Sequence, residues 1–222
     1  MDARQQILEK IRTALKQDSH LPDDPPHETL IKATAIEPQT VEEKVRRFKE
    51  ELKAVSGESL EAGSATEIAE KISALLKEAS LSEVVISGGN MIDQVAQALS
   101  GRDIRILRPE ALPAESRKTS VAAVIVGVVE AAYAVADTAT LVIPLMGRNP
   151  LPHFLPEIVI ALVRAQSLVG NHFELFARLS PEERKNMLLV TGPSRTADIE
   201  KILILGAHGP RRLIVCIVPE AI

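Results

Sequence analysis

The chain has 222 residues, of which 45% are hydrophobic and 25% charged, as in an ordinary globular protein. Only 2% are aromatic and the net charge is −4, so the chain offers neither stacking rings nor the positive charge that nucleic acid binding needs. We therefore expect no nucleic acid partner. The single cysteine, Cys216, excludes an intrachain disulfide and an iron–sulfur cluster held by cysteines of this chain alone, and its apolar surroundings predict a buried free thiol.

The chain begins with an expected amphipathic helix. Residues 2–17 carry Ile7, Leu8, Ile11 and Leu15 at helical spacing, and residues 18–39 then contain four prolines and no sustained apolar pattern, which is typical of a linker. We expect an N-terminal extension of residues 1–39 before a domain of residues 40–222. The helix packs on its own domain, on a neighbouring subunit of a homo-oligomer or on another partner. No uncharged run reaches transmembrane length, so we expect a soluble, cytoplasmic protein.

Residues 40–107 alternate between helix and strand patterns. Capping boxes that begin at Thr40 and Ser64 predict two helix starts, and residues 58–62 between these helices predict an edge strand. Residues 84–86 and 104–107 are expected strands joined by a glycine turn and a helix, a βαβ unit with parallel strands. The expected fold is α/β, with a central mixed, mostly parallel sheet flanked by helices.

The turn of Ser87, Gly88, Gly89 and Asn90 follows one of these strands and precedes a helix. Ligands of α/β folds bind at this position, where the backbone N–H groups of a helix N-terminus face them. The turn lacks the dinucleotide fingerprint and the P-loop pattern, so no cofactor is evident. Small residues are also what a tight connection requires. We hold these four residues as ligand-binding candidates.

The longest apolar region, residues 121–144, contains two charged residues, Glu130 and Asp137, and predicts two or three central strands. A lone carboxylate is costly to bury, so each must be paired, exposed at a strand end, or functional. Asp137 and Thr138 fall between two apolar stretches, where a sharp turn displays both side chains at the edge of a sheet. Asp137 is therefore a candidate catalytic residue and Thr138 a candidate ligand-binding residue.

Residues 144–156 contain four prolines and predict a loop that carries Arg148, Asn149 and His153. This loop is either a flap over the site or a plain connector. Residues 158–163 are then an expected buried strand, and residues 168–179 an expected helix.

Residues 190–218 predict a strand–loop–strand–loop–strand unit. Its first loop gathers hydroxyls, a guanidinium and a carboxylate; the candidate ligand-binding residues are Gly192, Ser194, Arg195, Thr196 and Asp198. Backbone N–H groups, hydroxyls and an arginine fork suit a small carboxylate or phosphate. The second loop places His208 where chain reversal needs no histidine, so His208 is the second acid/base candidate.

The run TGPSRTADIE followed by LGAHGP resembles the C-terminal signature of the LUD-domain family, in its lactate utilization protein C branch. Residues 132–142, AYAVADTATLV, are similar to the family's other motif, with Ala139 where the family normally has glycine. The resemblance implies a fold like that of sugar-phosphate isomerases and CoA-transferases, with ligands at the carboxyl ends of strands. It also implies a part in the oxidation of L-lactate to pyruvate, alongside iron–sulfur companion proteins.

Four functions are open at this point. A triad of Ser194, His208 and Asp198 lacks the usual nucleophile elbow, and a metal site with His153 and His208 lacks paired histidines or cysteines. The third is an enzyme for a small anion, sugar phosphate or CoA ester, with Asp137 and His208 as acid and base. The fourth, which we favour, is a non-redox subunit of lactate oxidation that binds a carboxylate or stabilises the complex.

Overall fold

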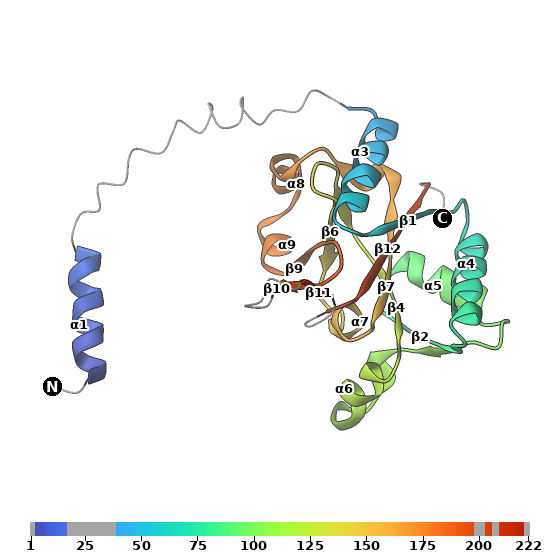
Figure 1. Cartoon of the computed structure of the whole chain (residues 1–222), viewed down its shortest axis with the longest axis horizontal. Helices are drawn as coiled ribbons and strands as arrows, with labels where there is room; N and C mark the ends of the chain where they lie inside the picture. The colour runs from blue at the N-terminus through green and yellow to red at the C-terminus, as the bar shows by residue number, and fades with distance from the viewer. Residues whose placement is uncertain (1–2, 17–38, 198–202, 206–208, 220–222) are drawn as a thin grey trace. The chain divides into compact units, whose positions relative to one another are not determined.

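The computed structural model describes residues 3–16, 39–197, 203–205 and 209–219 (Figure 1). The chain divides into two compact units, Met1–Ala35 and Ile36–Ile222. The first unit contains α1 (Ala3–Lys16), in which the apolar Ile7, Leu8 and Ile11 are exposed. No helix in the described ranges combines the length and the apolar character needed to cross a membrane.

Six strands of the described chain form a parallel sheet in the second unit, in the order β1-β12-β7-β4-β2-β3. They are β1 (Glu58–Glu61), β2 (Glu83–Ile86), β3 (Arg105–Leu107), β4 (Val126–Glu130), β7 (Ile158–Arg164) and β12 (Arg212–Val218). Each pair of neighbours is parallel. The predicted α/β fold with a mostly parallel central sheet is therefore confirmed, and β1 closes one edge as expected.

Helices cover both faces of this sheet (Figure 1). On one face lie α4 (Ala65–Glu78) and α5 (Asn90–Leu99), and on the other lies α3 (Val41–Ala54). Successive residues of a strand point to opposite faces, so Val128 packs with α4 and α5 whereas Val129 packs with α3. The predicted caps form: the side chains of Thr40 and Ser64 accept hydrogen bonds from the backbone at the starts of α3 and α4.

A second sheet, which the sequence did not predict, follows the carboxyl ends of β4 and β7. Its order is β8-β5-β6-β9, with β5 (Tyr133–Val135), β6 (Thr140–Pro144), β8 (Leu168–Val169) and β9 (Met187–Thr191). Residues 121–144 thus supply one central strand, β4, and two strands of the second sheet. The prediction of one helix over residues 168–179 was wrong, since β8 precedes α8 (His172–Arg178).

The second unit also contains these shorter helices: η1 (Pro109–Ala111), α6 (Ala114–Ala122), α7 (Leu151–Phe154), η2 (Ala165–Ser167) and α9 (Pro181–Lys185). The loop predicted over residues 144–156 contains α7, which packs on β4 so closely that a Cβ on Gly127 would lie 2.5 Å from the carbonyl oxygen of Pro152. A capping box at Ser180 begins α9.

Cys216 lies buried in β12, and burial raises the pKa of its thiol to about 11. The thiolate is the reactive form, so at pH 8 we expect the folded protein to react with a disulfide reagent about 100-fold more slowly than an unfolded thiol of pKa near 9. The rate of thionitrobenzoate release, followed by absorbance with and without urea, measures this ratio of reaction rates. A similar rate in both states would contradict the burial of this thiol.

The same shift makes stability depend on pH. The folded thiol stays neutral while the unfolded thiol ionises above pH 9.0, so its contribution is fully present below pH 9.0 and is lost as the pH rises towards 11. The free energy of unfolding in urea should therefore fall more between pH 8 and pH 10.5 for the natural protein than for Cys216→Ala.

Candidate functional site

The two motifs that are similar to the LUD signature lie side by side. Residues 136–139 form the turn between β5 and β6, and the antiparallel pairing of β6 with β9 sets Thr140 opposite Thr191. The Thr140 hydroxyl lies 2.8 Å from that of Thr138 and 2.6 Å from that of Thr191. We call Asp137, Thr138, Thr140 and Thr191 the Asp137 cluster. Its hydroxyl chain links the Asp137 turn to the residue directly before Gly192.

Asp137 is half-buried in this turn, and its backbone N–H donates to the Gly170 carbonyl at 3.2 Å. Its Oδ1 is fully buried and has no hydrogen-bond partner among the described residues. Nearly all buried polar atoms in folded proteins are hydrogen-bonded, so an unpartnered carboxylate oxygen in the same turn as Thr138 marks a place where a ligand O–H or N–H can bind.

Ala139 explains why glycine is expected at this point of the family motif. Its φ of 52° lies in the left-handed region, which costs an alanine about 1–2 kcal/mol and glycine almost nothing. The methyl group is fully buried and packs in the cluster that includes Phe48 and Leu141. It therefore lies in the core beneath the turn, on the α3 side of the sheet.

The segment after β9 is held on two sides. Gly192 has a φ of 75°, and a Cβ there would lie 2.9 Å from Val55 Cγ2 at the end of α3. The Ser194 N–H donates to the Pro210 carbonyl at 2.8 Å. The first loop of the predicted C-terminal unit is therefore bonded to Pro210, at the end of the second loop.

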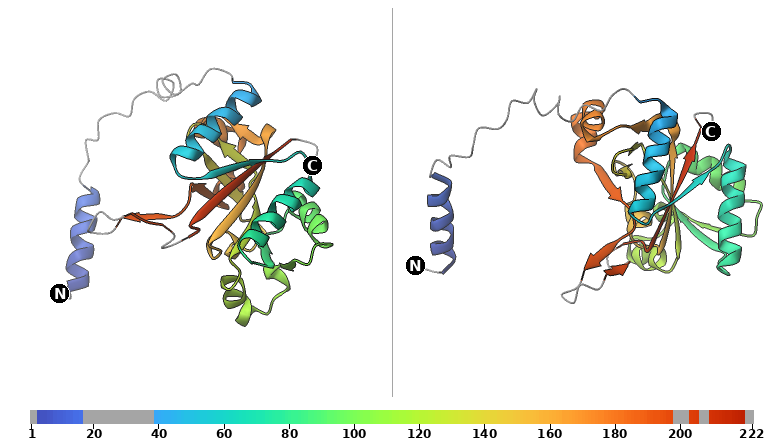
Figure 2. Two further views of the ribbon diagram at one scale, coloured as in Figure 1. Left: turned by 45° about the vertical axis from the view of Figure 1, so that its right-hand side comes forward. Right: turned by 45° about the horizontal axis from the view of Figure 1, so that its top comes forward.

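Other predicted residues of these loops are described in part or not at all. Asp198 and His208 lie outside the described residues. Arg195 and Thr196 belong to β10 (Arg195–Ala197), which pairs with β11 (Leu203–Leu205), so the loop predicted over these positions is partly a strand. Figure 2 shows β10 and β11 as a ribbon that extends away from the central sheet. The structure places their backbone there, and their roles as ligand-binding residues stay predictions.

The Ser87–Asn90 turn lies at the carboxyl edge of the central sheet, as predicted, between β2 and α5. Ser87 is buried; its N–H donates to the Val128 carbonyl at 3.1 Å, and its hydroxyl has no partner among the described residues. Gly89 is needed for space, since a Cβ there would overlap with the Glu130 carboxylate.

Glu130, the last residue of β4, occupies the N-terminus of α5. Its Oε2 accepts a hydrogen bond from the Met91 N–H at 3.1 Å, and its Oε1 lies 3.6 Å from the Arg164 guanidinium. A carboxylate of the protein thus already satisfies part of the anion-binding position that the sequence predicted here. An anionic ligand at this turn must compete with Glu130. No hydrogen bond or ion pair in the described ranges joins this turn to the Asp137 cluster.

Three residues of these sites were missed in the sequence. Thr140 and Thr191 were missed because each ends or begins an apolar run, and the turn at residues 136–139 that brings the hydroxyls of Thr138 and Thr140 together is not a pattern of spacing. Arg164 follows the strand of residues 158–163, and its place beside Glu130 comes from the pairing of β4 with β7.

A family model described as LUD domain matches residues 45–218. The chain belongs to the LUD domain family. The match contains both motifs of the Asp137 cluster and begins inside α3, so α1 lies before the LUD domain. The family resemblance stated from the sequence is thereby confirmed.

Curated relatives cover part of the LUD domain. A protein called Lactate utilization protein C from Geobacillus thermodenitrificans is 32% identical over 104 residues, 43% of this chain and 42% of that protein. Another of the same name from an Exiguobacterium species is 34% identical over 108 residues, 46% of each chain. The chain spans less than half the length of these relatives. A solved structure of a DUF162 family protein from Deinococcus radiodurans matches with a TM-score of 0.61 and 19% identity, over 82% of this chain and 99% of that one, and supports the fold alone.

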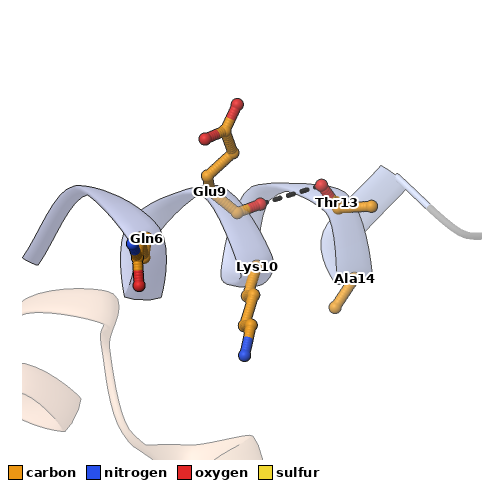
Figure 3. Close-up of a pocket in the computed structure, with 5 residues that line it drawn as sticks. All are labelled: Gln6, Glu9, Lys10, Thr13 and Ala14. Atoms are coloured by element: carbon orange, nitrogen blue, oxygen red, sulfur yellow. Dashed lines mark hydrogen bonds between the residues drawn. The ribbon is translucent and has the colours of Figure 1, made fainter. Parts of the chain in front are cut away.

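Neither a metal-binding cluster of side chains nor the hollow along α1 provides a further candidate ligand site among the described residues. The described residues contain no group of three or more His, Cys, Asp or Glu side chains that could hold a metal ion. Figure 3 shows a hollow lined by exposed residues of α1, namely Gln6, Glu9, Lys10, Thr13 and Ala14. The Thr13 hydroxyl donates to the Glu9 carbonyl at 2.8 Å, an ordinary contact within a helix. None of these side chains is a buried polar group that needs a ligand.

Proposed function

We propose that this LUD domain protein takes part in lactate utilization as a non-redox subunit that binds a small carboxylate at the Asp137 cluster. Relatives called Lactate utilization protein C support the process, over less than half of their length. Iron–sulfur companion proteins would carry the electrons, since this chain has a single cysteine, Cys216, buried in β12. The observation that carries the site is the 2.6 Å contact of Thr140 with Thr191, which joins both motifs beside the unpartnered oxygen of Asp137.

The chemistry of the cluster suits a 2-hydroxy carboxylate. Asp137 Oδ1 accepts a hydrogen bond from the α-hydroxyl. Thr140 has one proton and donates to only one of its two neighbours, so one end of the hydroxyl chain, Thr138 or Thr191, is free to donate to the carboxylate. Arg195, three residues after Gly192 in the sequence, is our candidate for the guanidinium that such a carboxylate prefers. Asp137 and His208 are the candidates for moving the hydroxyl proton.

The alternative is an enzyme for a sugar phosphate or CoA ester that binds at the Ser87–Asn90 turn. Its position at the carboxyl edge of a parallel sheet favours a ligand, and the unpartnered Ser87 hydroxyl does too. The carboxylate of Glu130, which already accepts from Met91, opposes an anion there. We therefore place the carboxylate at the Asp137 cluster.

A binding experiment tests the proposal. A ligand at about a hundred times its dissociation constant stabilises the fold by roughly 2.7 kcal/mol and raises the melting temperature by several degrees. The screen includes L-lactate, pyruvate, a sugar phosphate, CoA and nucleotides. We expect L-lactate to bind and Asp137→Asn to weaken it at least about tenfold, because the amide keeps the shape but removes the charge that attracts the hydroxyl proton. Asp93→Asn, an exposed carboxylate of α5 that pairs with Arg108, is the matched control.

Two outcomes would contradict the proposed site. One is unchanged lactate binding in Asp137→Asn. The other is growth on lactate that survives Asp137→Asn and Arg195→Ala but is abolished by deletion of residues 1–39, which would favour a role in assembly alone.

A further inference from the structure

A second group of unpartnered polar atoms lies around α7, near the start of β4. His153 of α7 is 3% exposed, and its Nδ1 lies 2.9 Å from the Pro150 carbonyl oxygen. A carbonyl accepts, so Nδ1 carries the proton and Nε2 of the neutral ring keeps a lone pair. That Nε2 is buried and has no partner among the described residues. Burial first, and then the charge of Arg148, lower the pKa of His153, while its bond to Pro150 opposes them.

Two guanidinium groups accompany this ring. Arg148 lies in the turn directly before α7, where its backbone N–H donates to the Leu145 carbonyl at 3.1 Å, and one of its terminal nitrogens is buried without a partner among the described residues. Arg117 of α6, which contacts α7, donates from a terminal nitrogen to the Leu112 carbonyl at 2.9 Å, and its Nε is buried without a partner. Neither arginine forms an ion pair with an acidic side chain of the described chain. Glu110 accepts from the Asn149 N–H, next to Arg148 in the chain, at 3.3 Å.

Unpartnered buried groups are costly, at about 1–3 kcal/mol each and more for a charged group. Three in one region are therefore unusual for a structural connection. Guanidinium N–H groups donate to oxyanions, whereas the lone pair of a neutral imidazole accepts from an O–H. A ligand that satisfies both must carry negative oxygen and a hydroxyl together.

We propose that Arg148 and His153, with Arg117, form a site for a small oxyanion that also carries an O–H group, such as hydrogen phosphate or a 2-hydroxy carboxylate. Entry is over the turn before α7, where Met146 and Gly147 are exposed and no atom lies within 4 Å of a Cβ position on Gly147. This site lies outside the Asp137 cluster and goes beyond the proposed function.

Calorimetric titration of the full chain at neutral pH tests this site with four probes. Inorganic phosphate and L-lactate carry the O–H group, whereas sulfate and pyruvate lack it. We expect phosphate, lactate or both to bind at millimolar concentrations, and the matching probe without O–H to bind at least about tenfold more weakly. Which of the two binds decides between a phosphate and a hydroxy acid as the ligand.

Variants separate this site from the Asp137 cluster. Arg148→Gln and His153→Phe should each weaken binding at least about tenfold, whereas Arg178→Gln, an exposed arginine paired with Glu174 in α8, should not. Asp137→Asn should leave phosphate binding intact, and all lactate titrations use the Asp137→Asn background, so that the Asp137 cluster does not contribute to the measured binding. Arg148 lies in a surface turn, so its variant remains informative if His153→Phe fails to fold. The proposal is overturned if neither phosphate nor lactate binds, if Arg148→Gln binds as the natural protein does, if sulfate or pyruvate binds equally well, or if Asp137→Asn abolishes phosphate binding.

Discussion

Replacement of Phe48 by alanine is expected to lower the free energy of unfolding by about 3–5 kcal/mol, the range for deletion of a buried aromatic ring. Phe48 lies in the middle of α3, is 0% exposed and packs in the cluster between α3 and the sheets. The same cluster includes several buried alanines, which are Ala131, Ala134, Ala136, Ala139 and Ala161. Alanine has no side-chain torsion with which to fill a cavity, so we expect an effect in the upper part of the range.

Urea unfolding, followed by circular dichroism, measures this loss. Phe173→Ala is the matched control, since Phe173 lies on α8 and is 49% exposed. We expect the control to cost less than about 1 kcal/mol. Equal losses for the two variants would show that Phe48 does not hold α3 on the sheet.

Replacement of Gly127 by alanine is expected to cost about 2–3 kcal/mol through overpacking. A Cβ there would lie 2.5 Å from the Pro152 carbonyl oxygen and 2.9 Å from Pro156 Cγ. These are backbone and proline ring atoms, which cannot rotate aside, so α7 must move away from β4. At other strand positions, replacing glycine by a residue with a Cβ stabilises the strand. A lower free energy of unfolding in Gly127→Ala therefore measures this close approach directly.

Gly101→Ala serves as the control for this experiment, because no atom lies within 4 Å of its Cβ position and its φ is not positive. We expect it to be neutral or to stabilise the protein by up to about 1 kcal/mol, since alanine restricts the unfolded chain. If Gly127→Ala is equally well tolerated, α7 is not packed on β4 as described. The Gly127 variant should also weaken ligand binding at Arg148 and His153 if that site depends on the position of α7.

Local patterns in the sequence were enough for the elements that depend on near neighbours. The caps at Thr40 and Ser64 marked the starts of α3 and α4, because a capping side chain binds the backbone three residues away. The alternation of strands and helices predicted the α/β class. The motif around Asp137 and the TGPSRT run identified the LUD domain family before any fold was known.

The predicted site shows the limit of such patterns. The turn at Asp137 and Thr138 follows from a polar pair between apolar stretches, but Thr191, which Thr140 links to this turn, is about fifty residues further along the chain. The Ser87–Asn90 turn predicted an open anion position, and only the pairing of β2 with β4 brings Glu130 into it. The ligand roles of these residues stay predictions for the experiments above.

The sequence by itself thus determined the helices and strands of residues 40–107 and the faces they bury, because these properties repeat with the period of one element. Its motifs determined the family. Tertiary structure alone decided that β1 pairs with β12, that β5, β6, β8 and β9 form a second sheet, and that Thr140 meets Thr191. Strand neighbours are chosen by packing between segments far apart in the chain, where the energies of many apolar strands are nearly equal and no local spacing distinguishes them.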